Sequence, residues 1–459
     1  MDYYLLNPYL RRVLVAVAAD FAVFGIAALS AWTMPGQHLP AAEFWTLSGV
    51  GAVTAFIALY YCDAYSPQVL GSGRANVSSV FSAMGLAFIG ALVLYFAVHT
   101  QAGVVSSLAV MAGVYFPLLF TERLTFRWIS SFPRFDERVL VIGASELGLA
   151  IARAMRDRPN LGISLVGFLT DDEDLVHRQF SLEGYPVLGK VHEIEKVMAA
   201  RSIRRVVVAS KDRSEYFPED ELLAAKLANI RIESGISFYE RVAGRIYLRG
   251  LRASYLIFSD GFRQSRLSSG LKRCIDVVGA SVGLALAGPV LALAAAAIKL
   301  DSKGPVLFRQ DRLGLGGETF EVLKLRSMRV DAEVDGPRFT SERDDRITRV
   351  GSFIRKTRID ELPQLLNVLR GDMSFVGPRP ERPEFVETIS ERYPYFRLRC
   401  SVKPGVTGWA QIRHGYVNDL AGFEEKLALD LYYLKYRSFG MDLLVLWQTV
   451  KTLVTLQGV

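Results

Sequence analysis

Two adjacent carboxylates, Asp360 and Glu361, have neighbours suited to phosphoryl transfer. Three cationic side chains precede the pair, namely Arg355, Lys356 and Arg358. Leucines at 362, 365, 366 and 369 follow with the period of an amphipathic helix, and Pro363 suits only its first turn. The unpaired N–H groups and the positive dipole end of such a turn attract anions. The pattern predicts a carboxylate nucleophile beside a phosphate site, with helix capping as the alternative.

Further cations with the right chemistry occur on both sides of this pair. Arg379 stands between two prolines, so its planar guanidinium is held on a stiff loop and suits two-point contact with a phosphate. A surface turn would explain the same tripeptide. Lys324 and Arg326 are two residues apart and would share one face of a strand. There they would clamp a diphosphate or simply face solvent.

The stretch RIDELPQLLNVLRGDMSFVGPRP at 358–380 resembles the signature of the polyprenyl-phosphate phosphoglycosyl transferases. These bacterial membrane enzymes begin exopolysaccharide, O-antigen or glycan assembly. The resemblance extends from about Leu271 to the C-terminus through GPVLFRQDRLG at 304–314, FEVLKLRSM at 320–328 and VKPGVTGWAQIRHG at 402–415. It implies transfer of a sugar 1-phosphate from a UDP-sugar, with glucose or galactose favoured, to undecaprenyl phosphate and release of UMP.

The resemblance also implies roles for matching residues. Asp360 would form a phospho-aspartyl intermediate, and Asp360 or Glu361 would hold magnesium, with manganese as the alternative metal. Phosphate or substrate contacts would fall on five cations, namely Arg309, Lys324, Arg326, Arg379 and Lys403. Lys403 stands where the family usually has arginine, so the charge is kept while the guanidinium fork is lost.

The first 125 residues predict a bundle of four membrane helices. The four apolar stretches are 13–33, 44–62, 80–98 and 104–121. Each has about the 20 residues that a helix needs to cross a bilayer. Lys and Arg lie before the first stretch, between the second and third, and after the fourth, which places both ends of the bundle in the cytoplasm. Asp20 within the first stretch is either a functional carboxylate or a paired residue.

Residues 135–258 predict a Rossmann-like α/β domain, because buried strands alternate with helical stretches. Gly143 and Gly148 belong to the turn after the first strand and form part of a dinucleotide fingerprint. This partial pattern favours a tight structural turn, and nucleotide binding stays open. A Ser- and Gly-rich linker at 259–270 follows the domain.

Residues 271–459 predict an α-rich α/β catalytic domain that begins with an apolar segment at about 272–300. Lys and Arg flank this segment on both sides, and Pro289 lies near its middle, which favours a re-entrant membrane helix over a fifth spanning helix. The resemblance implies the same element, with Gly288 where many members have serine. The expected location is therefore the bacterial inner membrane, multi-pass, with the catalytic domain on the cytoplasmic face and in contact with membrane lipid.

Composition limits the other classes of function. Of the 459 residues 51% are hydrophobic, and the net charge of +7 suits anionic lipid and phosphorylated substrates. The chain has no basic nucleic-acid motif, so we expect no nucleic-acid partner. Its three scattered cysteines argue against a disulfide framework and a zinc site. A homodimer through the membrane helices or the α/β domain is an open expectation.

Two other functions compete with the transferase. A membrane nucleotide-sugar dehydratase or epimerase would use the α/β domain for catalysis, and it would need a YxxxK pair and a complete Gly-rich loop. The chain has neither. A non-enzymatic regulator of polysaccharide assembly would need only the helices and a ligand-sensing domain, but it leaves the motifs after Leu271 unexplained.

Overall fold

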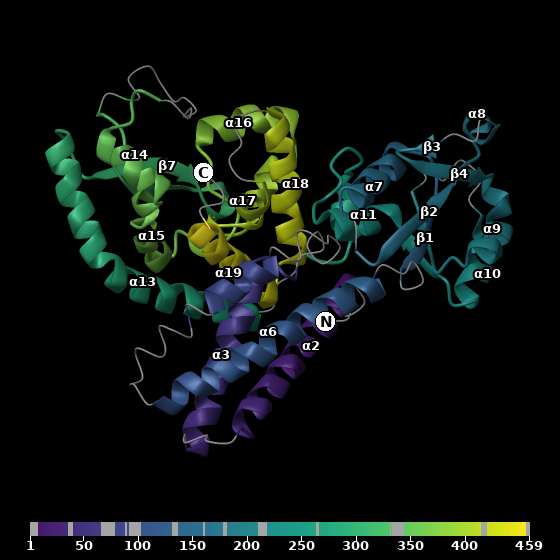
Figure 1. The fold of residues 1–459 in the computed structure, drawn as a ribbon. Coiled ribbons are helices and arrows are strands. Elements are labelled where there is room, and N and C mark those ends of the chain that lie inside the picture. Colours follow the sequence, from purple (N-terminus) through teal and green to yellow (C-terminus); the bar gives the residue numbers. More distant parts are fainter. Residues whose placement is uncertain are drawn as a thin grey trace. The chain divides into compact units, whose positions relative to one another are not determined.

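The structure is a computed structural model with two compact units, Met1–Ala243 and Gly244–Val459. It describes residues 8–34, 40–65, 79–87, 90, 102–130, 136–158, 161–177, 181–209, 218–262, 266–330, 332, 344–414 and 420–455. The first unit holds long N-terminal helices and a six-stranded sheet. The second unit holds the motifs that resemble a sugar transferase (Figure 1).

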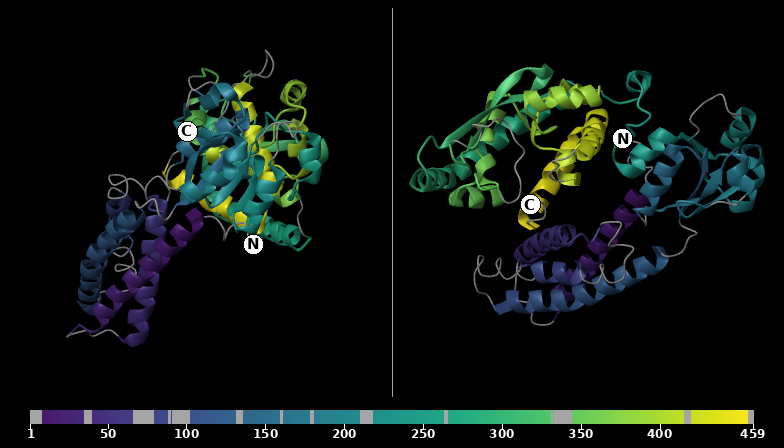
Figure 2. Two further views of the ribbon diagram at one scale, coloured as in Figure 1. Left: turned by 90° about the vertical axis from the view of Figure 1, so that its right-hand side faces the viewer. Right: turned by 90° about the horizontal axis from the view of Figure 1, so that it is seen from above.

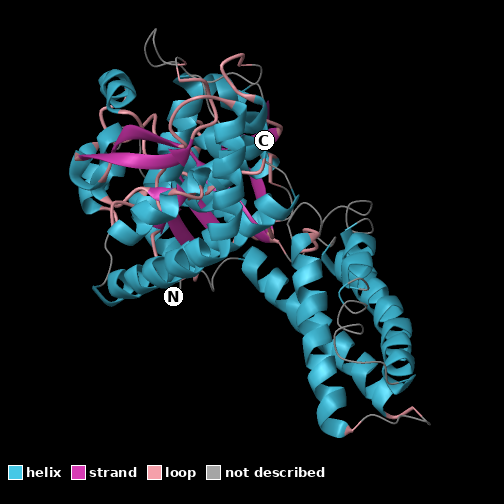
Figure 3. Ribbon diagram, turned by 90° about the vertical axis from the view of Figure 1, so that its left-hand side faces the viewer, coloured by secondary structure: helices cyan, strands magenta, loops and turns pink. Residues whose placement is uncertain are grey.

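Three long helices open the first unit and run side by side in Figures 2 and 3. They are α2 (Pro8–Trp32), α3 (Ala41–Tyr61) and α6 (Ala102–Ser130). In α2 the span Val13–Trp32, and the whole of α3, are long and apolar enough to cross a membrane. Helices thus occur at the first, second and fourth predicted stretches. Of the third, 80–98, the described residues 80–87 and 90 are helical and the others lie outside the described residues.

Asp20 forms an ion pair inside this helical region. Arg123 of α6 donates from Nη2 to Asp20 Oδ2 at 2.6 Å, and the Tyr65 hydroxyl donates to the same oxygen at 2.6 Å. All three side chains are buried. Of the two interpretations of Asp20, the paired residue therefore fits the structure. The ion pair connects α2 to α6.

The α/β part of the first unit has the predicted doubly wound character. Its strands follow the order β3-β4-β2-β1-β5-β6, with parallel pairing from β4 to β6 and an antiparallel edge at β3. The strands are β1 (Glu137–Ile142), β2 (Ile163–Leu169), β3 (Ser181–Leu182), β4 (Tyr185–Gly189), β5 (Arg205–Val208) and β6 (Arg231–Ser234). The helices are α7 (Glu146–Arg156), α8 (Glu173–His177), η2 (Val191–Glu193), α9 (Ile194–Arg201), α10 (Glu219–Leu227) and α11 (Gly235–Ala243).

The passage from β1 into α7 requires two glycines, Gly143 in the turn and Gly148 in the first turn of the helix. Gly143 has φ of 99°, in the left-handed region that favours glycine. A Cβ on Gly148 would lie 2.5 Å from the carbonyl oxygen of Gly143. Ser145 caps α7 by accepting a hydrogen bond from the Gly148 N–H at 3.3 Å. Backbone geometry thus explains why both positions are glycine, as the sequence favoured. Nucleotide binding at the turn stays open.

The second unit begins earlier than the predicted domain boundary at 258. The N–H of Ile246 donates to the Ala428 carbonyl at 3.0 Å, and Trp409 Nε1 donates to the Gly244 carbonyl at 2.9 Å. The chain after α11 therefore packs on helices of the catalytic domain. Sequence composition placed the boundary at the polar stretch after 258, whereas these contacts move it to Gly244.

The rest of the second unit is rich in helices, with two short sheets, as predicted. The β7–β8 hairpin is antiparallel, and β9 pairs in parallel with β10. Its first elements are α12 (Ala253–Phe258), α13 (Arg266–Asp301), β7 (Leu307–Leu313), η3 (Leu315–Gly317), β8 (Thr319–Leu325), α14 (Arg349–Lys356), η4 (Ile359–Glu361) and α15 (Gln364–Arg370). The later ones are β9 (Ser374–Val376), α16 (Pro383–Arg392), η5 (Phe396–Ser401), β10 (Gly405–Thr407), α17 (Trp409–His414), α18 (Leu420–Tyr436) and α19 (Phe439–Thr455).

Helix α13 packs along the catalytic domain with one face and exposes apolar residues on the other. Near its start Lys272 Nζ donates to the Val376 carbonyl at 2.9 Å, and near its middle Ala280 belongs to a buried cluster with residues of β8 and α15. Near its end Ile298 belongs to a buried cluster with Leu325 and Ile354. The outer face exposes large apolar side chains, among them Val282, Leu286 and Leu293. Pro289 lies inside the helix, and Figure 1 shows that α13 bends along its length.

Candidate active site

The acidic pair lies on η4, a short 3-10 turn that leads into α15. Arg358 precedes the turn with φ of 58°, so the chain changes direction between α14 and η4. Pro363 directly precedes α15, and Gly371 ends it with φ of 95°. The predicted start and end of this helix are therefore confirmed.

The side chain of Asp360 is buried and accepts no hydrogen bond from the described residues. Its exposed fraction is 9%, and within the described part of the chain no side chain or N–H donates to its carboxylate. Burial and the adjacent charge of Glu361 raise the pKa of Asp360 to about 6. At neutral pH the group is therefore mainly an ionised carboxylate that no hydrogen bond stabilises, which is a suitable state for a nucleophile.

Glu361 is held by two of the predicted phosphate-binding cations. Arg379 donates from Nη2 to Glu361 Oε1 at 2.6 Å, and Lys324 Nζ lies 3.8 Å from the same oxygen. Burial opposes ionisation, but Arg379 and Lys324 outweigh it and hold the pKa of Glu361 at about 2. Burial lowers the pKa of Lys324 to about 8, with Glu361 acting in the opposite direction. The structure thus brings together four predicted residues, Asp360, Glu361, Lys324 and Arg379.

Arg309 does not join this group. In the hairpin Phe308 pairs with Lys324 and Arg309 pairs with Leu323. Because directly opposite residues share a face of the sheet, Arg309 and Lys324 lie on opposite faces. The Arg309 side chain is exposed and its Nη1 lies 3.3 Å from Glu321 Oε2. We therefore remove Arg309 from the expected phosphate contacts.

Arg326 is buried, and its guanidinium binds backbone carbonyl groups. It is 5% exposed, and its guanidinium donates to the carbonyls of Lys303 and Ser302 at 2.7 and 2.8 Å. These contacts tie the end of α13 to the end of β8. Arg326 directly follows Leu325, the last residue of β8, and its N–H donates to the Val306 carbonyl at 2.8 Å.

Lys403 lies at the far end of α15 from the acidic pair. Its Nζ is 3.3 Å from the position that a Cβ on Gly371 would take, and Arg273 donates to the last carbonyls of the helix nearby. Two cations there offset the negative end of the helix dipole. The seven residues of α15 extend about 10 Å, so Lys403 is separated from Glu361 by the length of the helix. Helix capping accounts for its position.

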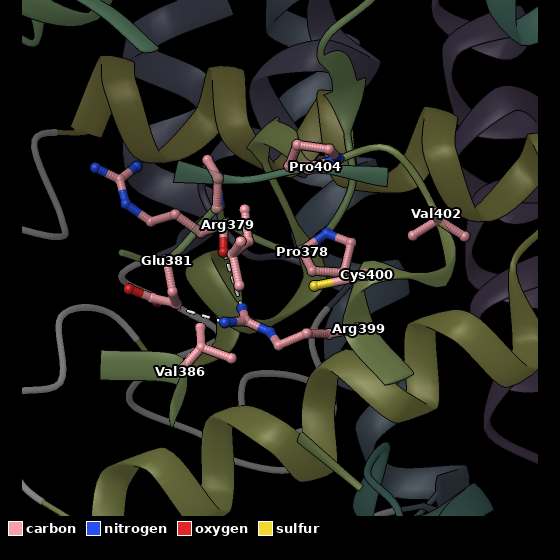
Figure 4. A pocket seen from close by; sticks show the side chains of 11 residues that line it. Pro378, Arg379, Glu381, Val386, Arg399, Cys400, Val402 and Pro404 are labelled. Atoms are coloured by element: carbon pink, nitrogen blue, oxygen red, sulfur yellow. Dashed lines mark hydrogen bonds and ion pairs between the residues drawn. The ribbon is translucent and has the colours of Figure 1, made fainter. Parts of the chain in front are cut away.

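A buried charge cluster behind Arg379 was not predicted. Glu381 forms an ion pair with Lys426, and its carboxylate lies 3.6 Å from both Arg312 and Arg399. The cluster borders a pocket lined by parts of 313–314, 378–386 and 399–404 (Figure 4). Its members come from β7, η5 and α18, so spacing along the chain carries no signal for them. Only the position of Glu381 directly after Pro-Arg-Pro hinted at it.

The buried Glu381 predicts sensitivity to acid. Burial opposes its charge, but Lys426 and Arg399 outweigh this and lower its pKa from 4.5 to about 2. A carboxyl with a lowered pKa stabilises the fold above the unfolded value, and this contribution is lost as pH falls from about 4.5 towards 2. We expect E381Q to lose on the order of 3 kcal/mol of unfolding free energy at pH 7. Between pH 5 and pH 3 it should also lose less stability than the wild type.

Thermal unfolding of both proteins in the same detergent across this pH range measures the difference. Glu384→Gln on the exposed face of α16 is the matched control, for which we expect the wild-type pH dependence. Parallel curves for the wild type and E381Q would contradict the assignment of acid sensitivity to Glu381.

Two family models match the chain. A model described as bacterial sugar transferase matches residues 267–456, from the start of α13 to the end of α19. A model described as CoA-binding domain matches residues 61–213, which include β1 to β5. The first match begins in the predicted linker and continues through the predicted catalytic domain. The second begins within the predicted helix bundle and ends within the predicted α/β domain.

The chain is similar to relatives that are named as undecaprenyl-phosphate transferases. A UDP-glucose:undecaprenyl-phosphate glucose-1-phosphate transferase of Caulobacter vibrioides is 47% identical over 188 residues, which are 40% of this chain and 70% of that protein. A protein of the same name from Klebsiella pneumoniae is 33% identical over 318 residues, 68% of this chain and 67% of the relative.

A third relative, from Aeromonas hydrophila, is a UDP-N-acetylgalactosamine-undecaprenyl-phosphate N-acetylgalactosaminephosphotransferase. It is 39% identical over 234 residues, 51% of this chain, and the match spans 55% of that protein, about half its length. The motif at 358–380, the geometry around Asp360 and these matches agree. The chain belongs to the bacterial sugar transferases of the polyprenyl-phosphate phosphoglycosyl transferase family.

Proposed function

We propose that the protein transfers a sugar 1-phosphate from a UDP-sugar to undecaprenyl phosphate, releases UMP, and so begins exopolysaccharide or O-antigen assembly. The observation that carries the proposal is that the two carboxylates of the acidic pair have different surroundings. Asp360 is buried and unbonded, while Glu361 holds Arg379 and Lys324 beside it. Phosphoryl transfer needs such a nucleophile together with cations for the oxygens of the transferred phosphoryl group.

The reaction proceeds by two displacements at one phosphorus atom. A carboxylate oxygen of Asp360 attacks the sugar-bearing phosphorus, a P–O bond forms to Asp360, and the P–O bond to UMP breaks. UMP leaves with the electron pair. An oxygen of undecaprenyl phosphate then attacks the same phosphorus, and Asp360 leaves as a carboxylate. The covalent intermediate is an acyl phosphate, and neither step requires a proton on Asp360.

Arg379 and Lys324 bind the donor diphosphate in this scheme. Both cations already contact one carboxylate oxygen of Glu361. When the donor binds, its diphosphate therefore either displaces the Glu361 carboxylate from these two cations or contacts them together with it. Arg379 offers a planar fork for two phosphate oxygens, whereas Lys324 supplies a single point charge.

Magnesium fits the two carboxylates. The contacts of Glu361 with Arg379 and Lys324 use Oε1, so Oε2 and the Asp360 carboxylate are the oxygens that would hold the ion. Protein magnesium sites commonly use one or two carboxylates together with substrate phosphates. The bound ion would neutralise charge on the diphosphate, and manganese accepts the same ligands. The described residues contain no group of three or more His, Cys, Asp or Glu that could hold a metal.

The membrane arrangement belongs to the same proposal. We place the catalytic domain on the cytoplasmic face of the inner membrane and take α13 as a re-entrant helix that contacts lipid. Three observations support this. The helix α13 contacts the rest of the catalytic domain near both of its ends, through Lys272 and Ile298. Its outer face is apolar and exposed, and Pro289 lies within a bent helix. A domain in contact with both ends of a helix is difficult to divide across a bilayer.

Labelling of single cysteines in a cysteine-free background tests this topology. Gly270→Cys lies at the start of α13, where an added Cβ has open space, and Lys303→Cys lies at its exposed far end. We expect an impermeant maleimide to label both only in inverted vesicles. Ala42→Cys, at an exposed position in the first turn of α3 on the side expected outside, should be labelled in intact spheroplasts. Labelling of position 303 in intact spheroplasts would overturn the re-entrant assignment.

Release of UMP tests the proposed function. Purified protein would be incubated with undecaprenyl phosphate, magnesium and, in turn, UDP-glucose, UDP-galactose or UDP-N-acetylgalactosamine. We expect UMP and a lipid-linked sugar diphosphate from at least one donor, with UDP-glucose tried first because two relatives are named for it. Absence of UMP with every donor, or release of UDP in its place, would contradict the proposal.

A further inference from the structure

The backbone that carries Arg379 is held at four consecutive carbonyl groups. The carbonyl oxygens of residues 378, 379, 380 and 381 accept hydrogen bonds, in that order, from Gly405 N, Arg399 Nη2, Arg312 Nη1 and Leu313 N, at 2.9, 2.9, 3.0 and 2.9 Å. Two donors are backbone N–H groups and two are arginine side chains. Such complete tethering leaves the segment little freedom to move the Arg379 side chain away from Glu361.

Arg399 is the more deeply buried of the two arginine donors, at 4% exposed. Its Nε and Nη2 donate to Asp430 Oδ2 at 3.2 and 2.6 Å, and its guanidinium lies 4.8 Å from the centre of the Phe396 ring. Nη1 lies 3.6 Å from Glu381 Oε1. Figure 4 shows the guanidinium between Glu381 and the Arg379 backbone. These contacts leave Arg399 a single orientation.

The energetic balance of this cluster points to a role beyond stability. Buried ion pairs are often no more stabilising than apolar side chains of the same volume, because desolvation offsets the attraction. Apolar side chains at 399 and 430 would fill the same space, but they would give the Arg379 carbonyl no donor. The hydrogen bond from Arg399 to that carbonyl connects the cluster directly to the backbone of Arg379, the residue whose side chain binds Glu361.

We propose that Arg399 is a positioning residue for the transfer reaction. Its hydrogen bond to the Arg379 carbonyl, oriented by Asp430, holds the Arg379 guanidinium where the donor diphosphate binds. Arg399 itself touches no substrate. The inference rests on the proposed function, because it assigns Arg399 an effect that acts only through Arg379.

Arg399→Lys is the discriminating substitution. A lysine keeps the positive charge, but its ammonium group cannot bind the Asp430 carboxylate and the Arg379 carbonyl with the geometry of a planar guanidinium. Misplacement of a binding group by about 1 Å can lower a rate about 100-fold. We expect R399K to lower kcat/KM for UMP release about 10- to 100-fold.

A double-mutant cycle separates positioning from a general structural effect. In the Arg379→Ala background there is no guanidinium to position, so we expect R399K to change kcat/KM by less than about threefold. Multiplication of the two single losses in the double variant would overturn the proposal, as would full activity of R399K. If the wild type releases no UMP from any donor, the proposed function fails and this inference fails with it.

Two further variants complete the test. Arg205→Lys is the matched control, because Arg205 is equally buried and paired with Glu137 and Glu233 in the α/β domain. We expect its kcat/KM within twofold of the wild type. If R399K does not fold, R312K weakens the neighbouring tether at the Pro380 carbonyl. For R312K we expect a smaller loss that also disappears in the Arg379→Ala background, and a loss that persists there would overturn the proposal.

Discussion

Asp360→Asn is expected to lower the rate of UMP release by at least about 10⁴-fold, because a carboxamide cannot form the acyl phosphate. The substitution is nearly isosteric and removes no hydrogen bond within the described residues. The pKa of Asp360 is raised to about 6 by burial and by Glu361, so its ionised form costs the fold free energy at pH 7. We therefore expect D360N to be as stable as the wild type, or more stable by on the order of 1–3 kcal/mol.

The first half-reaction isolates this step. Without acceptor, a UDP-sugar labelled in its sugar-bearing phosphate should label the wild-type protein on Asp360 and leave D360N unlabelled. Asp311→Asn, the same chemical change at an exposed position on β7, should be labelled like the wild type. UMP release by D360N within tenfold of the wild-type rate would show that another group is the nucleophile.

Arg379→Ala is expected to lower kcat/KM about 10³-fold, in the range found when a cation at a transferring phosphoryl group is removed. The loss follows from the geometry, because Arg379 Nη2 lies 2.6 Å from the carboxylate of Glu361, the residue directly after Asp360. The backbone of Arg379 belongs to the tethered segment. Arg379→Lys should recover part of the activity, since the charge remains while the fork is lost. Steady-state UMP release over a range of donor concentrations separates kcat from KM.

Arg392→Ala provides the control for Arg379. Arg392 is exposed at the end of α16, so its removal should leave kcat/KM within twofold. A loss below about tenfold in R379A would mean that Arg379 does not bind the transferred phosphoryl group. The ion pair with Glu361 would then be its main role.

Local features of the chain were predictable because they depend on neighbouring residues. Pro363 and Gly371 delimit α15 as expected, since each restricts the backbone at its own position. Gly143 and Gly148 shape the strand-to-helix turn for the same kind of reason. The motif at 358–380 identified the family, which the relatives confirm.

For features that depend on distant residues, the type of structural element was predictable but its exact boundary was not. Apolar segments predicted membrane helices, and long helices occur at three of the predicted stretches. The end of the α/β domain was misplaced, because the segment after α11 is assigned by its contacts with Ala428 and Trp409, far along the chain. Composition at a boundary carries no information about such contacts.

The motifs in the chain were thus enough to identify the family and to name the acidic pair as the candidate site. The charges that meet at the pair follow from the folded chain and not from the motif. Lys324 and Arg379 converge on Glu361, whereas Arg326 falls beyond the end of β8. On η4 adjacent side chains are rotated by about 120° at three residues per turn, so one carboxylate of the pair meets the cations and the other does not. Charge and spacing name the candidates, but strand ends, turn geometry and packing from distant segments set their directions.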